Sequence, residues 1–264
     1  MTTIEAAGAM KIRAGIELGN LTDVGCKRED NQDSYGYFEP DSDEEFKKKG
    51  RLVMVADGMG GHEGGQIDSG IAVEVLRNSY RDSETDDSET ALIDAMTAAH
   101  LAIRNFAGEH PELTGMGTTC TAAVLRDGSL FYGHVGDSRM YLMRDSHITQ
   151  VTRDQTVTER MIEQGIIKPE EAKSHPDYHV LTSAMGVRES LEAEFPNAPI
   201  PLSAGDILLF CTDGLHDLVN DDEMLAMATA NGDAWSACKR LIALAKERGG
   251  HDNITIQIVK VQPS

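Results

Sequence analysis

The sequence predicts an α+β fold in which antiparallel sheets are flanked by helices. Its 264 residues place strand-like segments first, then two helical segments, more strands, further helices and a last strand. A parallel α/β fold would instead alternate strand and helix one at a time. A two-residue turn signal at Asp127–Gly128 also favours antiparallel neighbours. With no repeat, linker or low-complexity tract, the chain is expected to form one domain over residues 1–264.

The first elements are two strands separated by polar residues. Residues 11–19 ("KIRAGIELG") and 51–58 ("RLVMVADG") have strand composition, and the second is apolar after its first residue, as in a strand buried on both faces. Residues 40–50 ("PDSDEEFKKKG") between them are expected to form a polar turn or short excursion.

Two amphipathic helices are expected next. The first carries a stripe of apolar residues at helical spacing: Ile67, Ile71, Ala72, Val75 and Leu76. After a solvated loop at residues 82–90, Ser88 is positioned to cap the second helix. Its apolar side contains Leu92, Met96, Ala99, Ile103 and Phe106. Both stripes are interpreted as core-packing faces.

Strand signals return at residues 118–152, which resemble a meander. Residues 153–180 are polar, with one short helical pattern around Val157 and Met161 and another starting at "KPEE", and are expected to leave the sheet. A second buried strand follows in "GDILLFCTDGL" (205–215). Two helices come next, and the second presents one apolar face: Trp235, Cys238, Leu241, Ile242 and Ala245. Residues 253–261 close the chain as a strand.

Charge and cysteine usage narrow the possible partners and the compartment. The formal net charge of -20 argues against nucleic acid or an anionic membrane surface as partner. Four scattered cysteines form no CxxC pair and no zinc spacing, so a reducing, cytoplasmic setting is expected. The N-terminus lacks the apolar core of a signal peptide, and no stretch approaches the roughly 18 apolar residues of a membrane span.

Four aspartates stand at the ends of apolar strands. Asp57, Asp137 and Asp213 follow strand-like runs, and Asp252 directly precedes the last one. One such aspartate would be an ordinary turn residue, but four are expected to converge if the strands share sheets. Close carboxylates repel and need a cation. Oxygen ligands without cysteine favour magnesium or manganese. A plain calcium site is the alternative, but the sequence contains no EF-hand spacing that would support it.

Glycines and an arginine accompany these carboxylates. In "VADGMGGHEGG" (55–65), five of the eight residues after Asp57 are glycine, so the backbone can come close and the carbonyl of Gly58 can coordinate a cation. Arg28 is five residues before Asp33. Alone it would be a surface residue. Beside a metal cluster, its guanidinium matches a phosphate bidentately and makes a locally positive pocket in a negative protein.

Seven motifs follow one another along the chain: "GCKREDNQDSY", "VADGMGGHEGG", "GTTCTAAV", "VGDSR", "LTSAMG", "FCTDGLHD" and "GHDNIT". In this order they resemble the metal-dependent protein phosphatases (PPM family, type 2C class), with the bacterial serine/threonine phosphatases as the nearest type. The resemblance extends from about residue 12 to 260. It implies a four-layer α-β-β-α sandwich of two antiparallel sheets with helices outside. It also implies hydrolysis of phosphoserine and phosphothreonine in proteins by a metal-activated water.

The resemblance also implies roles for individual residues. Asp57 would bridge two Mn²⁺ or Mg²⁺ ions, with the Gly58 carbonyl on one and Asp213 and Asp252 on the other. A third, weaker ion would use Asp137 and Asp213 with Asp217. Asp33 would orient the attacking water, Arg28 would bind the substrate phosphate, and residues 153–180 would form the flap beside the substrate groove. The animal pattern differs at two positions, where this chain has Gln32 and Met59.

The identity of the general acid and the exact substrate stay open at this stage. His62 is one candidate for the acid, and a bound water or no acid at all are the alternatives. Cys120 and Arg126 have the CxxxxxR spacing of cysteine phosphatases, but the residues between them contain no glycine and have strand composition; Cys26, Cys120 and Cys211 are interpreted as core or near-core residues. A non-catalytic binding module or a hydrolase of other phosphoesters are rival functions. We expect a monomer that acts on phosphorylated proteins and opposes a bacterial serine/threonine kinase.

Overall fold

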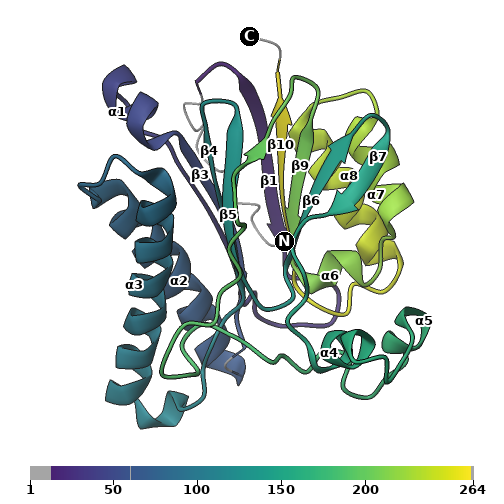
Figure 1. Cartoon of the computed structure of the whole chain (residues 1–264). Coiled ribbons are helices and arrows are strands. Elements are labelled where there is room, and N and C mark those ends of the chain that lie inside the picture. The colour runs from purple at the N-terminus through teal and green to yellow at the C-terminus, as the bar shows by residue number, and fades with distance from the viewer. Residues whose placement is uncertain (1–12, 60, 263–264) are drawn as a thin grey trace.

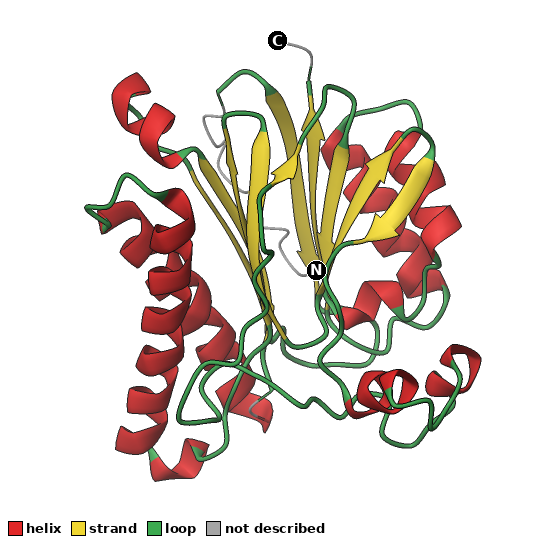
Figure 2. Cartoon of the chain, in the orientation of Figure 1, coloured by secondary structure: helices red, strands yellow, loops and turns green. Residues whose placement is uncertain are grey.

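Two five-stranded sheets face each other, and helices cover both outer sides (Figures 1 and 2). The structure is a computed structural model that describes residues 13–59 and 61–262, and of residues 61–63 the backbone alone. Every strand pairing is antiparallel. The predicted four-layer α-β-β-α sandwich of the α+β class is therefore confirmed.

The chain visits each sheet more than once. The first sheet contains, in spatial order, β2 (Asp33–Phe38), β3 (Arg51–Asp57), β4 (Cys120–Arg126), β5 (Ser129–Val135) and β8 (Ile200–Pro201). The second contains β1 (Ile16–Asp23), β10 (Ile254–Val261), β9 (Ile207–Cys211), β6 (Arg139–Arg144) and β7 (His147–Gln150). Strands near both ends of the sequence thus lie side by side in one sheet.

The central strands are buried on both faces. In β3, Leu52 and Met54 pack outward with the helices α2 (Gly61–Asp82) and α3 (Ser88–Glu109), whereas Val53 and Val55 pack inward against the second sheet. This matches the continuous apolar run predicted for residues 51–58. The second sheet is covered by α6 (Asp213–His216), α7 (Asp221–Thr229) and α8 (Ala234–Glu247).

A buried glutamine joins the two sheets. The side chain of Gln257 in β10 is fully buried. Its Oε1 accepts a hydrogen bond from the Met54 N–H at 3.1 Å, and its Nε2 donates to the Gly36 carbonyl at 3.1 Å. Both bonds reach from the second sheet to the first. They fix how the sheets are placed along the strand direction, and therefore how the strand ends meet.

Residues 153–180 leave the sheets, as predicted. They contain the short helices α4 (Val157–Glu163) and α5 (Pro169–Ala172), which lie below the strands in Figure 1. A single bridge between Thr156 and Leu181 closes the excursion at its base. A 3-10 turn at Pro111–Leu113 follows α3. No helix in the described part of the chain is long and apolar enough to span a membrane.

The structure corrects two predictions near the helices. The polar segment 40–50 contains a helix, α1 (Asp43–Lys49), in which Ser42 Oγ accepts from the Glu45 N–H at 3.2 Å. Acidic residues in its first turn and lysines in its last turn suit the helix dipole. The N-cap of α3 is Asp87, one residue before the predicted Ser88, because the carboxylate reaches two backbone N–H groups of the first turn.

The predicted meander at 118–152 is split between the two sheets. The hairpin at Asp127–Gly128 is confirmed, with φ of 50° and 70° as a type I′ turn requires. β6 and β7 also pair, but in the other sheet. The chain crosses between the sheets at Gly136, whose φ of 99° turns the backbone where a side chain would collide with Thr119.

Three further expectations differ from the structure. Trp235 is 46% exposed, because Gly19 of β1 lies so close to the backbone at Ala234 that the small residue, not the indole, faces the sheet. Cys26 is exposed, whereas Cys120 and Cys211 are buried as expected. The first strand starts at Ile16 rather than at residue 11, and residues 11 and 12 lie outside the described part.

Replacing the bridging glutamine should destabilise the fold. Gln257→Leu leaves a buried N–H and a buried carbonyl without partners, so the free energy of unfolding should fall by about 1–3 kcal/mol. Urea unfolding followed by circular dichroism measures this. The exposed Gln262 supplies the matched control, since Gln262→Leu should stay within about 0.5 kcal/mol of the parent. Equal stability of the two variants would contradict the role given to Gln257.

Candidate metal centre

The four strand-end aspartates meet in one cavity at the end of the sandwich. The cavity has a volume of about 450 Å³. Its lining includes Asp57, Asp137, Asp213 and Asp252, together with Arg28 and Gly58. These residues come from both sheets and from loops far apart in sequence. The expected convergence of the carboxylates is therefore observed.

Asp57 is held by its backbone, which leaves its carboxylate free to face the cavity. It ends β3, and its N–H donates to Thr119 Oγ1 at 2.9 Å while its carbonyl accepts from Thr118 Oγ1 at 2.8 Å. Burial, and then the neighbouring carboxylates of Asp33 and Asp213, raise the pKa of Asp57 well above its usual value. The fold thus places a carboxylate where ionisation is unfavourable without a cation.

Asp33 lies directly opposite Asp57 in the β2–β3 ladder. It is buried, and Thr212 Oγ1 donates to its Oδ2 at 2.8 Å. Its Oδ1 accepts no hydrogen bond of ordinary geometry within the described part of the chain. Burial, with the charges of Asp213 and Asp252, raises the pKa of Asp33 to about 7.

Asp213 and Asp137 both follow sheet strands. Asp213 begins α6 two residues after β9, and its buried Oδ1 has no hydrogen-bond partner in the described part of the protein. Asp137 lies in the crossing between β5 and β6, where burial and the charge of Asp213 raise its pKa. Orphaned oxygens and mutual repulsion are what hard divalent cations relieve, so the residues fit Mn²⁺ or Mg²⁺.

Gly58 occupies a position that no side chain could share. A Cβ there would lie 1.8 Å from the Gly65 carbonyl oxygen and 2.5 Å from Asp68 Oδ1. Its N–H donates to the Gln32 carbonyl at 3.1 Å. The close approach of the Gly65 carbonyl to this residue explains why position 58 is a glycine.

Asp68 was not identified from the sequence. It is fully buried in α2 against Gly58, and neither carboxylate oxygen accepts a hydrogen bond of ordinary geometry within the described residues. Burial raises its pKa to about 8. No local sequence pattern distinguishes Asp68 from a helical aspartate that faces solvent. Asp68 follows the apolar Ile67 in a turn that is otherwise polar.

Arg28 lies at the mouth of the cavity beside Asp252. Its Nη2 donates to Asp252 Oδ2 at 2.7 Å, and its side chain is 50% exposed. Asn253 ties this loop to the end of β10, since its Oδ1 accepts from the Gln32 N–H at 2.8 Å and its Nδ2 donates to the Asp30 carbonyl at 2.9 Å. A half-exposed guanidinium at a fixed position suits a ligand that arrives from solvent.

His179 also borders the cavity, and no sequence pattern predicts its presence there. Its Nδ1 lies 3.6 Å from Asp213 Oδ2 and its Nε2 lies 3.6 Å from Asp217 Oδ2. The interaction with Asp213 raises its pKa to about 8, against the effect of partial burial. One ligand atom each of His179, Asp137 and Asp213 lie within 4.8 Å of one another, close enough to hold an ion. The histidine comes from the flap, whose position depends on tertiary structure.

Asp217 lies on the same side of α6 as Asp213, as their four-residue spacing predicts, and both face His179. Tyr178 Oη donates to Asp217 Oδ1 at 3.2 Å. Although burial acts in the opposite direction, contacts with His216 and His179 lower the pKa of Asp217. Asp217 lines a neighbouring pocket of about 600 Å³ rather than the cavity that contains Asp57.

His62 lies in the first turn of α2, and its side chain is outside the described part of the structure. The proposed cysteine alternative finds no support. Cys120 begins β4, is buried, and has its pKa raised to about 12 by burial. An extended strand cannot curl around a phosphate, and a buried neutral thiol is a poor nucleophile.

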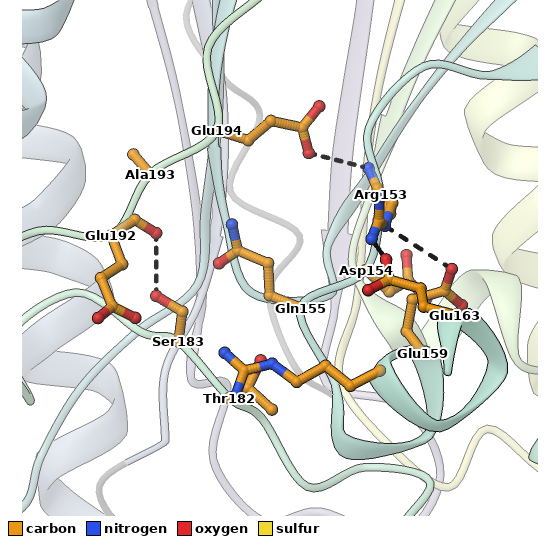
Figure 3. A pocket seen from close by; sticks show the side chains of 11 residues that line it. Arg153, Asp154, Gln155, Glu159, Glu163, Thr182, Ser183, Glu192, Ala193 and Glu194 are labelled. Atoms are coloured by element: carbon orange, nitrogen blue, oxygen red, sulfur yellow. Dashed lines mark hydrogen bonds and ion pairs between the residues drawn. The ribbon is translucent and has the colours of Figure 1, made fainter. Parts of the chain in front are cut away.

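A second pocket of about 450 Å³ lies between the flap and the loop at 182–194 (Figure 3). Within its lining, the Arg153 side chain contacts Glu163, and the Arg153 backbone N–H donates to Glu194. On its floor, Gln155 Oε1 accepts from the Gly136 N–H at 3.0 Å. This pocket therefore supports the loop that carries Asp137.

Comparison with known proteins gives consistent results. The family model described as protein phosphatase 2C matches residues 27–247. The protein phosphatase PhpP of Streptococcus pneumoniae is 32% identical over 251 residues, which cover 93% of this chain and 98% of that protein.

Two solved structures share the whole architecture. The serine/threonine phosphatase Stp1 from Staphylococcus aureus superposes with a TM-score of 0.86 at 28% identity, covering 96% of this chain and 98% of that one. The catalytic domain of PstP, solved in complex with two manganese ions, gives a TM-score of 0.79 at 32% identity, covering 94% and 99%.

Without divalent cations, the stability of the protein should decrease as pH rises. The folded-state pKa of Asp33 is about 7 against an ordinary 3.8. Because folding raises the pKa of this carboxyl, the contribution of Asp33 to stability is fully present below pH 3.8 and is lost as the pH rises through 7. We expect the melting temperature in chelator to fall between about pH 5 and 7.5. Saturating Mn²⁺ should reverse most of this fall at the higher pH.

Calorimetry of Asp57→Asn and of the exposed Asp94→Asn provides the comparison. Asp57→Asn removes one member of the repelling group and should show a shallower decline, whereas Asp94→Asn should follow the parent. A pH profile that is the same with and without Mn²⁺ would mean that these carboxylates do not share a cation.

Proposed function

Since the chain belongs to the protein phosphatase 2C family, we propose that it is a metal-dependent protein-serine/threonine phosphatase. The observation that supports this proposal most is the convergence of Asp57, Asp213 and Asp252 from two sheets in one cavity, with Arg28 at its mouth. Carboxylates that need divalent cations, beside a guanidinium that matches a phosphate, are the parts that phosphoester hydrolysis requires.

Two Mn²⁺ or Mg²⁺ ions would be held by these carboxylates. Asp57, the Gly58 carbonyl, Asp213 and Asp252 would be their ligands, since all four residues line the cavity. The solved PstP domain with two manganese ions supports this stoichiometry. A third, weaker site would use Asp137 and Asp213 with Asp217, of which Asp137 and Asp213 line the cavity.

Arg28 would bind the phosphoryl group of the substrate. In the structure its guanidinium pairs with Asp252 at 2.7 Å. With Asp252 as a cation ligand, its charge would be shared with the cation, and Arg28 would be able to turn toward an incoming phosphate. This exchange of partners makes an anionic substrate compatible with a chain of net charge -20.

The bound cations would supply an activated water as nucleophile for in-line attack on phosphorus. Asp33, fixed by Thr212, would orient that water through its second oxygen. His62 is proposed to give a proton to the serine or threonine oxygen as it leaves. Arg28 would stabilise charge that develops on the phosphoryl oxygens.

The biological setting is proposed from the same reasoning. The substrates would be phosphorylated proteins, with a serine/threonine kinase as the opposing activity. We propose that residues 1–264 act as one domain and as a monomer. Cysteines without metal or disulfide spacing favour a cytoplasmic location.

Loss of a bridging carboxylate should abolish activity. Asp57→Asn should lower kcat on a phosphothreonine peptide by about 100-fold or more, because the nucleophile depends on the cations. Asp94→Asn, on the exposed side of α3, should retain the parent rate. Both variants are assayed with Mn²⁺ and with chelator, and circular dichroism checks folding. Turnover by Asp57→Asn near the parent rate, or by the parent in chelator, would refute the proposed mechanism.

Arg28→Ala should weaken substrate use mainly through KM. A hydrogen bond to a charged partner contributes about 1.5–3 kcal/mol, which sets the expected loss in kcat/KM. A contact present equally in the ground and transition states appears in KM. Lys27→Ala, at the exposed neighbouring position, is the matched control. If both variants keep the parent kcat/KM, Arg28 is a surface residue rather than the phosphate ligand.

A further inference from the structure

Two apolar side chains lie exposed next to each other beside the metal cavity. Met59 is 39% exposed and Val187 is 51% exposed, and Met59 also lines the cavity with Asp57 and Gly58. Both approach the same point: a Cβ placed on Gly117 would be 2.5 Å from Val187 Cγ2 and 3.7 Å from Met59 Cε. We call this pair, Met59 and Val187, the apolar rim.

The apolar rim is held by backbone hydrogen bonds. The Met59 N–H donates to the Gly117 carbonyl at 2.8 Å. Thr118 and Met185 exchange two backbone bonds, of 3.2 and 2.9 Å, which place the strand-like segment before Val187 beside the one that carries Thr118. The backbone next to the rim therefore continues the strand pairing beyond the ends of β3 and β4.

Two glycines make this arrangement possible. Gly117 has no side chain that would separate the two rim residues. Gly186 adopts a φ of 87° and packs so closely that a Cβ would lie 2.3 Å from Ile103 Cγ2. The turn at Gly186 directs the chain outward just before Val187. A scattered surface residue needs no such support, whereas a fixed pair of exposed apolar residues suits recognition.

We propose that the apolar rim binds an apolar side chain of the phosphoprotein substrate, within two residues of the phosphorylated serine or threonine; this rests on the proposed phosphatase function. The apolar rim is continuous with the cavity through Met59, so a chain that reaches the cavity from this side would pass over it. An extended chain advances about 3.3–3.6 Å per residue, which limits the contact to the nearest neighbours.

Charge supports an apolar occupant over an acidic one. The chain carries a formal net charge of -20, so acidic residues beside the phosphate are repelled at a distance. The charged neighbour Arg188 is already paired with Glu192, at 2.7 Å. Apolar contact is then the attraction that the apolar rim itself can offer, and it discriminates among substrates without affecting the chemistry at the cations.

Matched phosphothreonine peptides test this proposal. The peptides vary one position at a time, among the two positions before and the two positions after the phosphothreonine. At the varied position, one set carries leucine and the other carries serine. We expect leucine to raise kcat/KM about 3- to 10-fold at one or more positions. Val187→Thr keeps the shape of the side chain but replaces a methyl group with a hydroxyl. It should lower the ratio of kcat/KM for leucine and serine peptides toward one. Leu101→Gln, exposed on α3 outside the cavity lining, should keep the parent ratio.

The outcomes separate this proposal from the function on which it rests. Equal rates for leucine and serine peptides, all dependent on Mn²⁺, would overturn the apolar rim proposal and leave the phosphatase intact. Hydrolysis of p-nitrophenyl phosphate with no hydrolysis of any peptide would instead overturn the protein phosphatase function. Sedimentation tests the other occupant: self-association lost in Val187→Thr, with equal peptide rates, would assign the apolar rim to a second copy of this chain.

Discussion

The structure of the site depends on repulsion among buried carboxylates. Asp33, Asp57 and Asp137 are buried or nearly so, and each has a pKa raised first by burial and then by the charge of its neighbours. The surrounding groups do not fully compensate the negative charge of these carboxylates. Thr119 bonds to the backbone of Asp57 and not to its carboxylate, and Thr212 reaches only one oxygen of Asp33. Divalent cations are the natural counter-charge, so cation binding and the folded geometry favour each other.

This constraint also explains the two-sheet architecture. Asp33 and Asp57 come from the first sheet, while Asp213 begins α6 after β9 and Asp252 precedes β10 of the second sheet. A cation held between them therefore joins the sheets at one end, as Gln257 joins them in the middle through hydrogen bonds. Apolar packing between the sheets has no directional preference. The polar bridges therefore determine the register in which the strand ends meet.

Much of the fold and part of the site could be predicted from the sequence. Continuous apolar runs ending in aspartate identified β3 and β9. The glycines after Asp57 predict a backbone that approaches a cation, whereas the close approach seen in the structure is that of Gly58 to Gly65 and Asp68. Features set by tertiary contact could not be read in this way. His179 reaches the cavity only because the flap folds back, and Trp235 faces solvent because Gly19 brings β1 against the helix backbone. The split of the central strands between two sheets likewise follows from packing at Gly136 and not from the period of the strands.

The distribution of cysteines has a practical consequence. Cys120, Cys211 and Cys238 are buried, and burial raises the pKa of Cys120 to about 12, so thiol reagents should react poorly with it. Cys26 is exposed, and its N–H donates to the Gly250 carbonyl at 2.7 Å, two residues before Asp252. Native protein thus offers one accessible thiol for a fluorescent or spin label, attached at the edge of the cavity without any engineered cysteine. Such a reporter would follow ion and substrate binding directly, independently of turnover.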